Sequence, residues 1–233
     1  MSVNEEKHVT KKVTLLNIDC MEYMATQPED AFDLAIVDPP YGIGFDGEVD
    51  AMANNNSKRW VSARGAGYER KSWDVEKPSA EYFNELERVS INRIIWGGNY
   101  FPLPQSRGWI FWDKGVAQNF TLSPGELAWT SFDKSIKKID LLWAGFRKCE
   151  ENKRIHPTQK PVKLYEWLLS SYAKPNQRIL DTHLGSGSSA IAAHYFGCEF
   201  VGCEIDKDYY DAAKERLNNE TRQLSLLDQD ESV

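Results

Sequence analysis

The sequence predicts a single α/β domain built around a mostly parallel β-sheet. Short apolar runs alternate with segments whose apolar residues recur at helical spacing, which is typical of strands joined by helices. One unit, residues 178–204, reads as a strand, a glycine-rich turn, a helix, a second strand and an acid. A chain of 233 residues is long enough for one such domain with a sizeable core, and two small domains are less favoured.

The expected elements follow from the spacing of apolar residues and from the turn residues between them. Strands are expected at 13–18, 33–37, 92–96, 108–112, 126–132, 140–146, 178–180 and 199–203. Helices are expected at 21–26, 79–89, 162–172, 189–196 and 206–218. The charged residues 1–12 and the polar segment from Thr221 onward should lie outside regular structure.

Composition limits the setting and the partners of the protein. The chain is 41% hydrophobic and 27% charged, as ordinary globular proteins are, and no run approaches the ~18 apolar residues that span a bilayer. The first residues lack an apolar signal segment, and the four cysteines show no CxxC pair and no zinc-like spacing. We therefore expect a reduced, cytoplasmic protein without a metal or a membrane partner. The net charge of −7 excludes a uniformly basic coat, so any contact with nucleic acid must use a local patch.

The turn Asp38-Pro39-Pro40-Tyr41 directly follows a buried apolar run. Each proline fixes its own φ and favours an extended residue before it, and neither proline has an N–H. The turn therefore presents carbonyl oxygens and one rigidly held carboxylate beside an aromatic ring. This set suits an exocyclic amino group on a flat ring, which offers two N–H donors and a face for stacking. A polyproline turn that simply leaves a strand is the alternative, because short motifs have false positives.

A second motif is the glycine-rich turn Gly185-Ser186-Gly187-Ser188 between a strand and a helix. Its glycines let the backbone approach a ligand closely, and Glu204 stands where an acid binds the hydroxyls of a ribose. No lysine follows the second glycine, so the turn is not a P-loop. The pattern matches the NAD fingerprint, which leaves an NAD-dependent oxidoreductase and a turn without a ligand as alternatives.

The late position of this turn argues against an ordinary dinucleotide fold. That fold starts with its glycine-rich turn and continues through several strands, whereas here only one strand and one helix follow the helix after the turn. The remaining strands must come from the N-terminal half, so the sheet is circularly permuted. Asp19, at the end of an early strand, would then follow Glu204 in spatial order and reach an adenine amino group.

Together these motifs resemble those of the amino-methyltransferases of DNA, in the permuted β-type order. The matching pieces are Asn17-Ile18-Asp19-Cys20, Asp38-Pro39-Pro40-Tyr41, His156-Pro157-Thr158-Gln159-Lys160-Pro161, residues 181–189 and Glu204. They span nearly the whole chain, and their joint occurrence in this order is specific. One departure is that the family usually has Asp-Pro-Phe before its Gly-Ser-Gly, where this chain has Asp181-Thr182-His183-Leu184. We assign His183 no role.

The resemblance implies a Rossmann-like, S-adenosylmethionine-dependent methyltransferase fold with a seven-stranded, mostly parallel sheet. Residues 1–233 would form one methyltransferase domain, with target-recognition inserts at about 42–78 and 113–155. The implied reaction moves a methyl group from S-adenosylmethionine, giving S-adenosylhomocysteine, to N6 of an adenine flipped out of double-stranded DNA. A turn that opens with Asp is more usual for adenine enzymes in this family, and one that opens with Ser for cytosine-N4 enzymes. A carboxylate would serve either amine, so a cytosine-N4 methyltransferase is the closest alternative.

The resemblance also implies roles for the motif residues. Catalysis would depend on the turn residues Asp38, Pro39, Pro40 and Tyr41. The expected cofactor contacts are Asp19, Cys20, Asp38, Thr158, Lys160, Asp181, Thr182, Gly185, Ser186, Gly187, Ser188, Glu204 and Ile205.

Two basic segments are candidates for contact with DNA. Residues 58–71 hold five basic residues and one acid, and residues 134–163 hold nine basic residues and three acids. The expected DNA contacts are Lys58, Arg59, Arg64, Arg70, Lys71, Lys137, Lys138, Arg147, Lys148, Lys153 and Arg154. A solvated basic loop and a catalytically idle nucleic-acid-binding module remain as alternatives. The sequence leaves open a homodimer and a restriction-enzyme partner.

Overall fold

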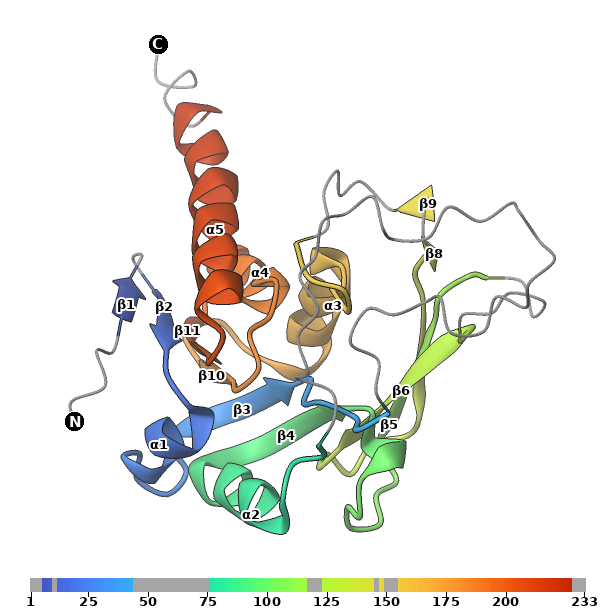
Figure 1. Ribbon diagram of the computed structural model, residues 1–233. Coiled ribbons are helices and arrows are strands. Elements are labelled where there is room, and N and C mark those ends of the chain that lie inside the picture. Colours follow the sequence, from blue (N-terminus) through green and yellow to red (C-terminus); the bar gives the residue numbers. More distant parts are fainter. Residues whose placement is uncertain are drawn as a thin grey trace, which may run out of the picture.

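The computed structural model describes residues 6–9, 12–43, 76–116, 123–144, 147–148 and 155–227. Within these ranges one nine-stranded sheet carries helices on both faces (Figure 1), and two further strands form a second, small sheet. The strands are β1 (Glu6–Val9), β2 (Val13–Asn17), β3 (Phe32–Val37), β4 (Ser90–Trp96), β5 (Trp109–Asp113), β6 (Gly125–Thr130), β7 (Lys137–Asp140), β8 (Trp143–Ala144), β9 (Arg147–Lys148), β10 (Arg178–Asp181) and β11 (Glu199–Glu204). The helices are α1 (Cys20–Ala25), α2 (Ala80–Val89), α3 (Val162–Tyr172), α4 (Ser188–Phe196), α5 (Lys207–Leu227) and the short 3-10 helix η2 (Gly98–Tyr100).

The large sheet runs in the order β1-β2-β11-β10-β3-β4-β6-β5-β7. The five strands from β2 to β4 are parallel, and β6 is antiparallel to both of its neighbours. Strands β10 and β11, which come late in the chain, lie between β2 and β3 from the N-terminal half. The predicted α/β class, the mostly parallel sheet and its permuted order are confirmed.

Strand β3 shows why the middle of the sheet is apolar. Its alternate residues point to opposite faces. Leu34 and Ile36 belong to the cluster that packs against α3, α4 and α5. Ala35 and Val37 belong to the cluster that packs against α1 and α2, and Phe32 joins that cluster from the first position of the strand. Helices cover both faces (Figure 1), so the strand has no polar side to alternate with the apolar one.

The strand count corrects the prediction of seven. Strand β1 and strand β7 extend the edges of the described sheet, and β1 lies in the segment that was expected to be irregular. Three of the four residues of β1 are exposed, so no apolar pattern marks the strand; it is held by antiparallel pairing with β2. The run predicted as one strand at 140–146 is instead divided, since β7 ends at Asp140 and β8 begins at Trp143.

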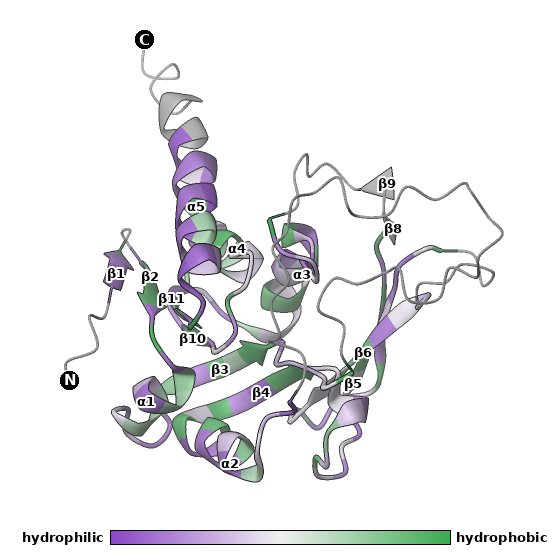
Figure 2. Cartoon of the chain, viewed as in Figure 1, coloured by the Kyte–Doolittle hydropathy of each residue, from purple (hydrophilic) through white to green (hydrophobic). Residues whose placement is uncertain are grey.

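The last helix is also longer than predicted, since it runs to Leu227 rather than 218. The Thr221 hydroxyl donates to the carbonyl of Leu217 at 2.9 Å, one turn back, so this polar residue remains within the helix. Figure 2 shows that the coloured part of α5 is mostly hydrophilic. Among the described residues, no helix combines the length and apolar character needed to cross a membrane.

Candidate active site

The two sequence motifs meet where the sheet changes its direction of winding. From β10 the chain proceeds to β11 on one side, and from β3 it proceeds to β4 on the other. The carboxyl ends of the strands at such a switch point are where open α/β sheets bind ligands. Asp38 directly follows β3 and Asp181 ends β10, and the pairing of Leu180 with Ala35 sets these two strands side by side. Residues far apart in the sequence therefore share one edge of the sheet.

The Asp38 carboxylate is held at both of its oxygens. The Tyr41 hydroxyl donates to Oδ1 at 2.7 Å, and the Lys160 ammonium donates to Oδ2 at 2.5 Å. The Asp38 side chain is 15% exposed, so it is mostly withdrawn from water. Burial raises the pKa of Asp38, the nearby Lys160 ammonium opposes that rise, and the Glu126 carboxylate adds to it. Two fixed donors thus give this carboxylate one orientation.

The Tyr41 ring is fixed by two aromatic neighbours and a glycine. It stacks on Tyr100 with a centroid separation of 5.0 Å and meets Phe101 edge-on at 6.2 Å. Gly97 has φ +66°, and a Cβ there would lie 2.2 Å from the Tyr41 ring. Only glycine fits at this close approach. The predicted stacking residue is therefore packed against η2, and Gly97 and Tyr100 are contributors that the sequence analysis missed. In the sequence, only the two adjacent glycines after a predicted strand indicated that this segment contributes to the site.

Lys160 lies in a buried set of alternating charges, which we call the Lys160 network: Asp38, Lys160, Glu126 and Lys114. The Lys160 side chain is 4% exposed and lies 3.1 Å from Glu126 Oε2. Lys114 donates to the other oxygen of Glu126, Oε1, at 2.5 Å. The Lys160 ammonium also lies 5.3 Å from the centre of the Trp96 ring. Two carboxylates and two ammonium groups leave the network without net charge.

The charge states in this network follow from its pairing. For Glu126, burial favours the neutral acid, but the Lys160 and Lys114 ammonium groups outweigh burial and lower the pKa to about 2. For Lys160, burial favours the neutral amine, but Asp38 and Glu126 outweigh it and raise the pKa. Glu126 is therefore ionised and Lys160 is protonated at neutral pH. The sequence analysis missed Glu126 and Lys114; an acid inside the apolar run of β6 was the available signal.

The glycine-rich loop is organised by Asp181. This buried carboxylate accepts from the Ser189 hydroxyl at 2.6 Å and from the His183 backbone N–H at 3.0 Å. Burial is the main cause that raises the pKa of Asp181 to about 7. The Thr182 hydroxyl bonds with that of Tyr82 in α2 at 2.7 Å, which fixes the start of the loop against the opposite helix layer.

The second half of the loop turns through two glycines with positive φ. Gly185 has φ +51° and Gly187 has φ +74°, and Gly187 directly precedes α4. The hydroxyls of Ser186 and Ser188 lie 3.1 Å apart, and Arg216 of α5 donates to the Ser186 carbonyl and the Ser188 hydroxyl. The predicted loop residues are thus together, with the serines turned toward α5.

Glu204, at the end of β11, supports the loop from the next strand. Its Oε2 accepts from the Gly185 N–H at 2.8 Å and its Oε1 from the Asp206 N–H at 2.9 Å. Burial is the main cause that raises the pKa of Glu204 to about 7. Ile205 follows and is 70% exposed, so an uncovered apolar surface adjoins this carboxylate.

Asp19 and Cys20 lie at the end of the next strand, β2. The Asp19 carboxylate accepts from the Met21 N–H at 2.7 Å and caps helix α1. Burial is the main cause that raises the pKa of Cys20 to about 12, so its thiol stays protonated. Carboxylates therefore follow three adjacent parallel strands: Asp19 after β2, Glu204 on β11 and Asp181 on β10.

Thr158 lies beside the loop through its neighbour His156. The Thr158 hydroxyl is 3.1 Å from His156 Nδ1, and the His156 ring lies about 3.7 Å from the position of a Cβ on Gly185. The same ring meets Tyr209 of α5 edge-on at 4.3 Å. His156 thus lies against the glycine loop and is contacted by Thr158, whereas Lys160 contacts the Asp38 turn.

The expected DNA-contact residues are only partly described. Lys58, Arg59, Arg64, Arg70, Lys71, Lys153 and Arg154 lie outside the described residues, as do the side chains of Arg147 and Lys148. Lys138 is paired with Asp113 at 2.9 Å and with Asp140 at 2.6 Å. The Lys137 ammonium lies over the Trp167 and Tyr172 rings, at 5.9 and 5.4 Å. These two lysines already have intramolecular partners.

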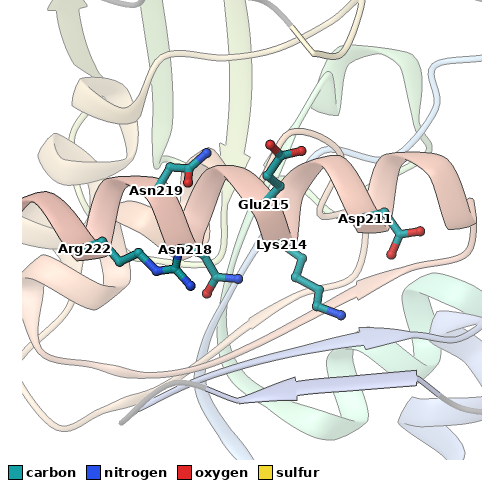
Figure 3. Close-up of a pocket in the computed structure, with 6 residues that line it drawn as sticks. All are labelled: Asp211, Lys214, Glu215, Asn218, Asn219 and Arg222. Atoms are coloured by element: carbon teal, nitrogen blue, oxygen red, sulfur yellow. The ribbon is translucent and has the colours of Figure 1, made fainter.

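A polar hollow of about 350 Å³ lies along α5, and none of the predicted site residues lines it (Figure 3). Its lining residues are Asp211, Lys214, Glu215, Asn218, Asn219 and Arg222. All six project from this one helix, and charges of both signs alternate along it. We assign it no role in the chemistry of the switch point.

Sequence comparison finds relatives over most of the chain. The family model for N6/N4 methyltransferases, described as DNA methylase, matches residues 105–215. The type II methyltransferase M.HpaI of Haemophilus parainfluenzae is 26% identical, covering 86% of this chain and 73% of the relative. The type II methyltransferase M.HinfI of Haemophilus influenzae is 27% identical, covering 88% of this chain and 68% of the relative.

Structural comparison finds the same kind of fold. The crystal structure of the M1.HpyAVI–SAM complex matches with a TM-score of 0.51 and 20% identity, covering 88% of this chain and 99% of that one. The PvuII DNA methyltransferase, described as cytosine-N4-specific, matches with a TM-score of 0.55 and 12% identity, covering 92% and 93%. At these identities the likeness concerns the fold.

Proposed function

Because the chain belongs to the N6/N4 family of DNA methyltransferases, we propose that it methylates N6 of an adenine flipped out of duplex DNA, using S-adenosylmethionine. The observation that carries the proposal is the Asp38 carboxylate, held in one orientation at the switch point of the sheet beside the glycine-rich loop. An acceptor for an amino group and a loop for a cofactor adjoin each other there.

The described residues fit S-adenosylmethionine by their chemistry. The molecule offers the hydroxyl donors of its ribose, the amino donors of its adenine, and a positive sulfonium. The strand ends offer the carboxylates of Asp19, Glu204 and Asp181 as acceptors, and Ile205 offers an exposed apolar surface for a flat ring. The pyrophosphate of NAD is anionic and would be repelled by the Asp181 carboxylate, which lies at the glycine-rich loop. This charge argument favours S-adenosylmethionine over the dinucleotide.

When bound, S-adenosylmethionine supplies a methyl group activated by attachment to positively charged sulfur. The adenine amine is a poor nucleophile because its lone pair is delocalised into the ring. Asp38 and the Pro39 carbonyl would accept its two N–H bonds, which localises the lone pair and stabilises the positive charge that develops on nitrogen. The surplus proton would leave along the hydrogen bond to Asp38. The rigid prolines keep both acceptors in place, so little reorganisation is needed.

The choice of adenine over cytosine depends on the carboxylate at the head of the turn. An Asp in this position is the more usual form in adenine enzymes of the resembled family. A hydrogen bond to a charged acceptor is also about twice as strong as one between neutral groups. The test is to incubate the protein with tritiated S-adenosylmethionine and DNA of varied sequence, digest the DNA to nucleosides and separate them. We expect label in N6-methyladenine, and label in N4-methylcytosine alone would refute the adenine assignment.

Contact with DNA would come from the two basic segments, 58–71 and 134–163, within one methyltransferase domain. The acidic net charge of −7 requires such a local patch. Lys137 and Lys138 would have to exchange their present partners for phosphate oxygens, since both are already engaged within the protein. We therefore expect the larger share of affinity from the other basic residues of the two segments.

A further inference from the structure

In the structure, both oxygens of Asp38 accept a hydrogen bond. Oδ1 accepts from Tyr41 and Oδ2 from Lys160, and the Lys160 contact, at 2.5 Å, is the shorter of the two. A target amine therefore competes with a buried ammonium for its acceptor. Leaving a buried charge without a partner costs several kcal/mol, so Lys160 needs another carboxylate if it is to release Asp38.

Glu126 is the carboxylate available for this exchange. Its Oε2 is buried and makes no hydrogen bond of good geometry among the described residues, although Lys160 Nζ lies only 3.1 Å away. Its other oxygen is fixed by Lys114 at 2.5 Å, so the acceptor cannot swing away from Lys160. A small displacement of the ammonium would improve its bond to Oε2 and vacate Asp38 Oδ2.

We propose that Glu126 is a positioning residue, which takes the Lys160 ammonium from Asp38 when a target amine arrives. This inference rests on the proposed methyl transfer. Glu126 acts through Lys160 and does not touch the substrate. The exchange keeps the buried charges paired in both states, since Lys160 is bound by Asp38 before the amine arrives and by Glu126 afterwards. While the Lys160 ammonium is bound to Asp38, it lies 5.3 Å from the centre of the Trp96 ring.

The test compares Glu126→Gln with the double variant Glu126→Gln/Lys160→Met. The amide of Gln keeps the shape of the side chain and loses its charge, so Lys160 should remain on Asp38. We expect kcat for methylation to fall about tenfold or more, as for loss of a charged partner near the reacting group, with a smaller change in KM. Removing Lys160 as well should vacate Asp38 and restore kcat at least threefold over the single variant. Rates are compared at the maximum between pH 7 and 9, with saturating S-adenosylmethionine.

The controls separate this inference from the function on which it rests. Glu87→Gln, which changes a carboxylate that is 66% exposed and pairs with Arg93, should methylate like the wild type. A wild type that transfers no methyl group would refute the proposed function itself. An active wild type with an equally active Glu126→Gln, or a double variant no faster than the single one, would refute the exchange and leave the function standing.

A structural measurement covers the case in which the variants do not fold. The wild type would be crystallised with duplex DNA containing its target and with sinefungin, a cofactor analogue without a transferable methyl group. Lys160 Nζ should then lie within hydrogen-bonding distance of Glu126 Oε2 and clear of Asp38 Oδ2. A Lys160 that still contacts Asp38 Oδ2 beside the bound amine would overturn the proposal.

Discussion

Replacement of Asp38 by alanine tests the acceptor at the head of the turn. The change removes the carboxylate that would accept an N–H bond of the target amine and leaves the prolines and the glycine-rich loop in place. In the structure the Asp38 carboxylate accepts from Tyr41 and Lys160, and both of these residues lie outside the loop 181–189. We therefore expect methyl transfer to be lost while cofactor affinity stays nearly unchanged.

The expected loss of catalytic rate can be compared with the expected loss of folding stability. Loss of one preorganised partner of a developing charge costs about 2.7–4 kcal/mol of barrier, or on the order of 10²–10³ in kcat. Loss of a hydrogen bond to a charged group costs about 1.5–3 kcal/mol of folding free energy, and Lys160 keeps Glu126 as a partner at 3.1 Å. The variant should thus remain folded, and its defect should be mainly catalytic.

The assay measures tritium transfer to DNA beside calorimetric titration with S-adenosylmethionine. Asp133→Ala is the matched control, because Asp133 forms an ion pair with Arg107 in which both side chains are about three-quarters exposed. It should retain full activity. Turnover of Asp38→Ala within a few-fold of the wild type would show that the carboxylate is not the acceptor.

Three further predictions follow from the structure. Gly97→Ala should lower the unfolding temperature and the methylation rate, because its Cβ would lie 2.2 Å from the Tyr41 ring at φ +66°; equal melting curves in differential scanning fluorimetry would contradict this packing. The free energy of unfolding should fall as pH rises from about 4.5 to 7, because burial raises the pKa of Glu204 to about 7 and the folded state therefore binds more protons than the unfolded state in that window. In urea titrations at several pH values, Glu204→Gln should flatten this fall, and an unchanged slope would count against the buried carboxyl as its source. Neutralising several lysines and arginines of residues 58–71 and 134–163, with the buried Lys160 left unchanged, should flatten the salt dependence of DNA affinity, since each phosphate contact releases counterions. An unchanged slope in fluorescence anisotropy at increasing salt would count against both segments.

The sequence alone was sufficient to predict the parts of the site whose residues are adjacent in the chain. Asp38 and Tyr41 are contiguous with the prolines that restrict them, and the glycine-rich turn lies between a recognisable strand and helix. The order of these motifs was enough to predict a permuted sheet, because one crossover pattern brings both to the same strand ends. These predictions used only spacing, backbone restriction and chain order, which a single sequence contains.

The parts that could not be predicted depend on partners distant in the chain. Glu126 is one acid in a strand, and its importance comes from Lys160 and Lys114 on other segments. Strand β1 has no apolar face and exists through its pairing with β2. A pattern read along the chain contains no information about which charges will be buried together, so networks and edge strands of this kind are revealed by the structure.

The insertion of β10 and β11 between β2 and β3 has a consequence for how the protein is made. Phe200 pairs with Val13, and Leu180 with Ala35, so the central strands join residues separated by most of the chain. During synthesis, β2 and β3 must wait without these neighbours until the last third of the chain has left the ribosome. Contacts of such long range slow folding and keep apolar strand edges uncovered for longer. A chain halted before residue 178 would hold the Asp38-Pro39-Pro40-Tyr41 turn but lack β10 and β11, which complete the sheet, and we expect it to depend on chaperones.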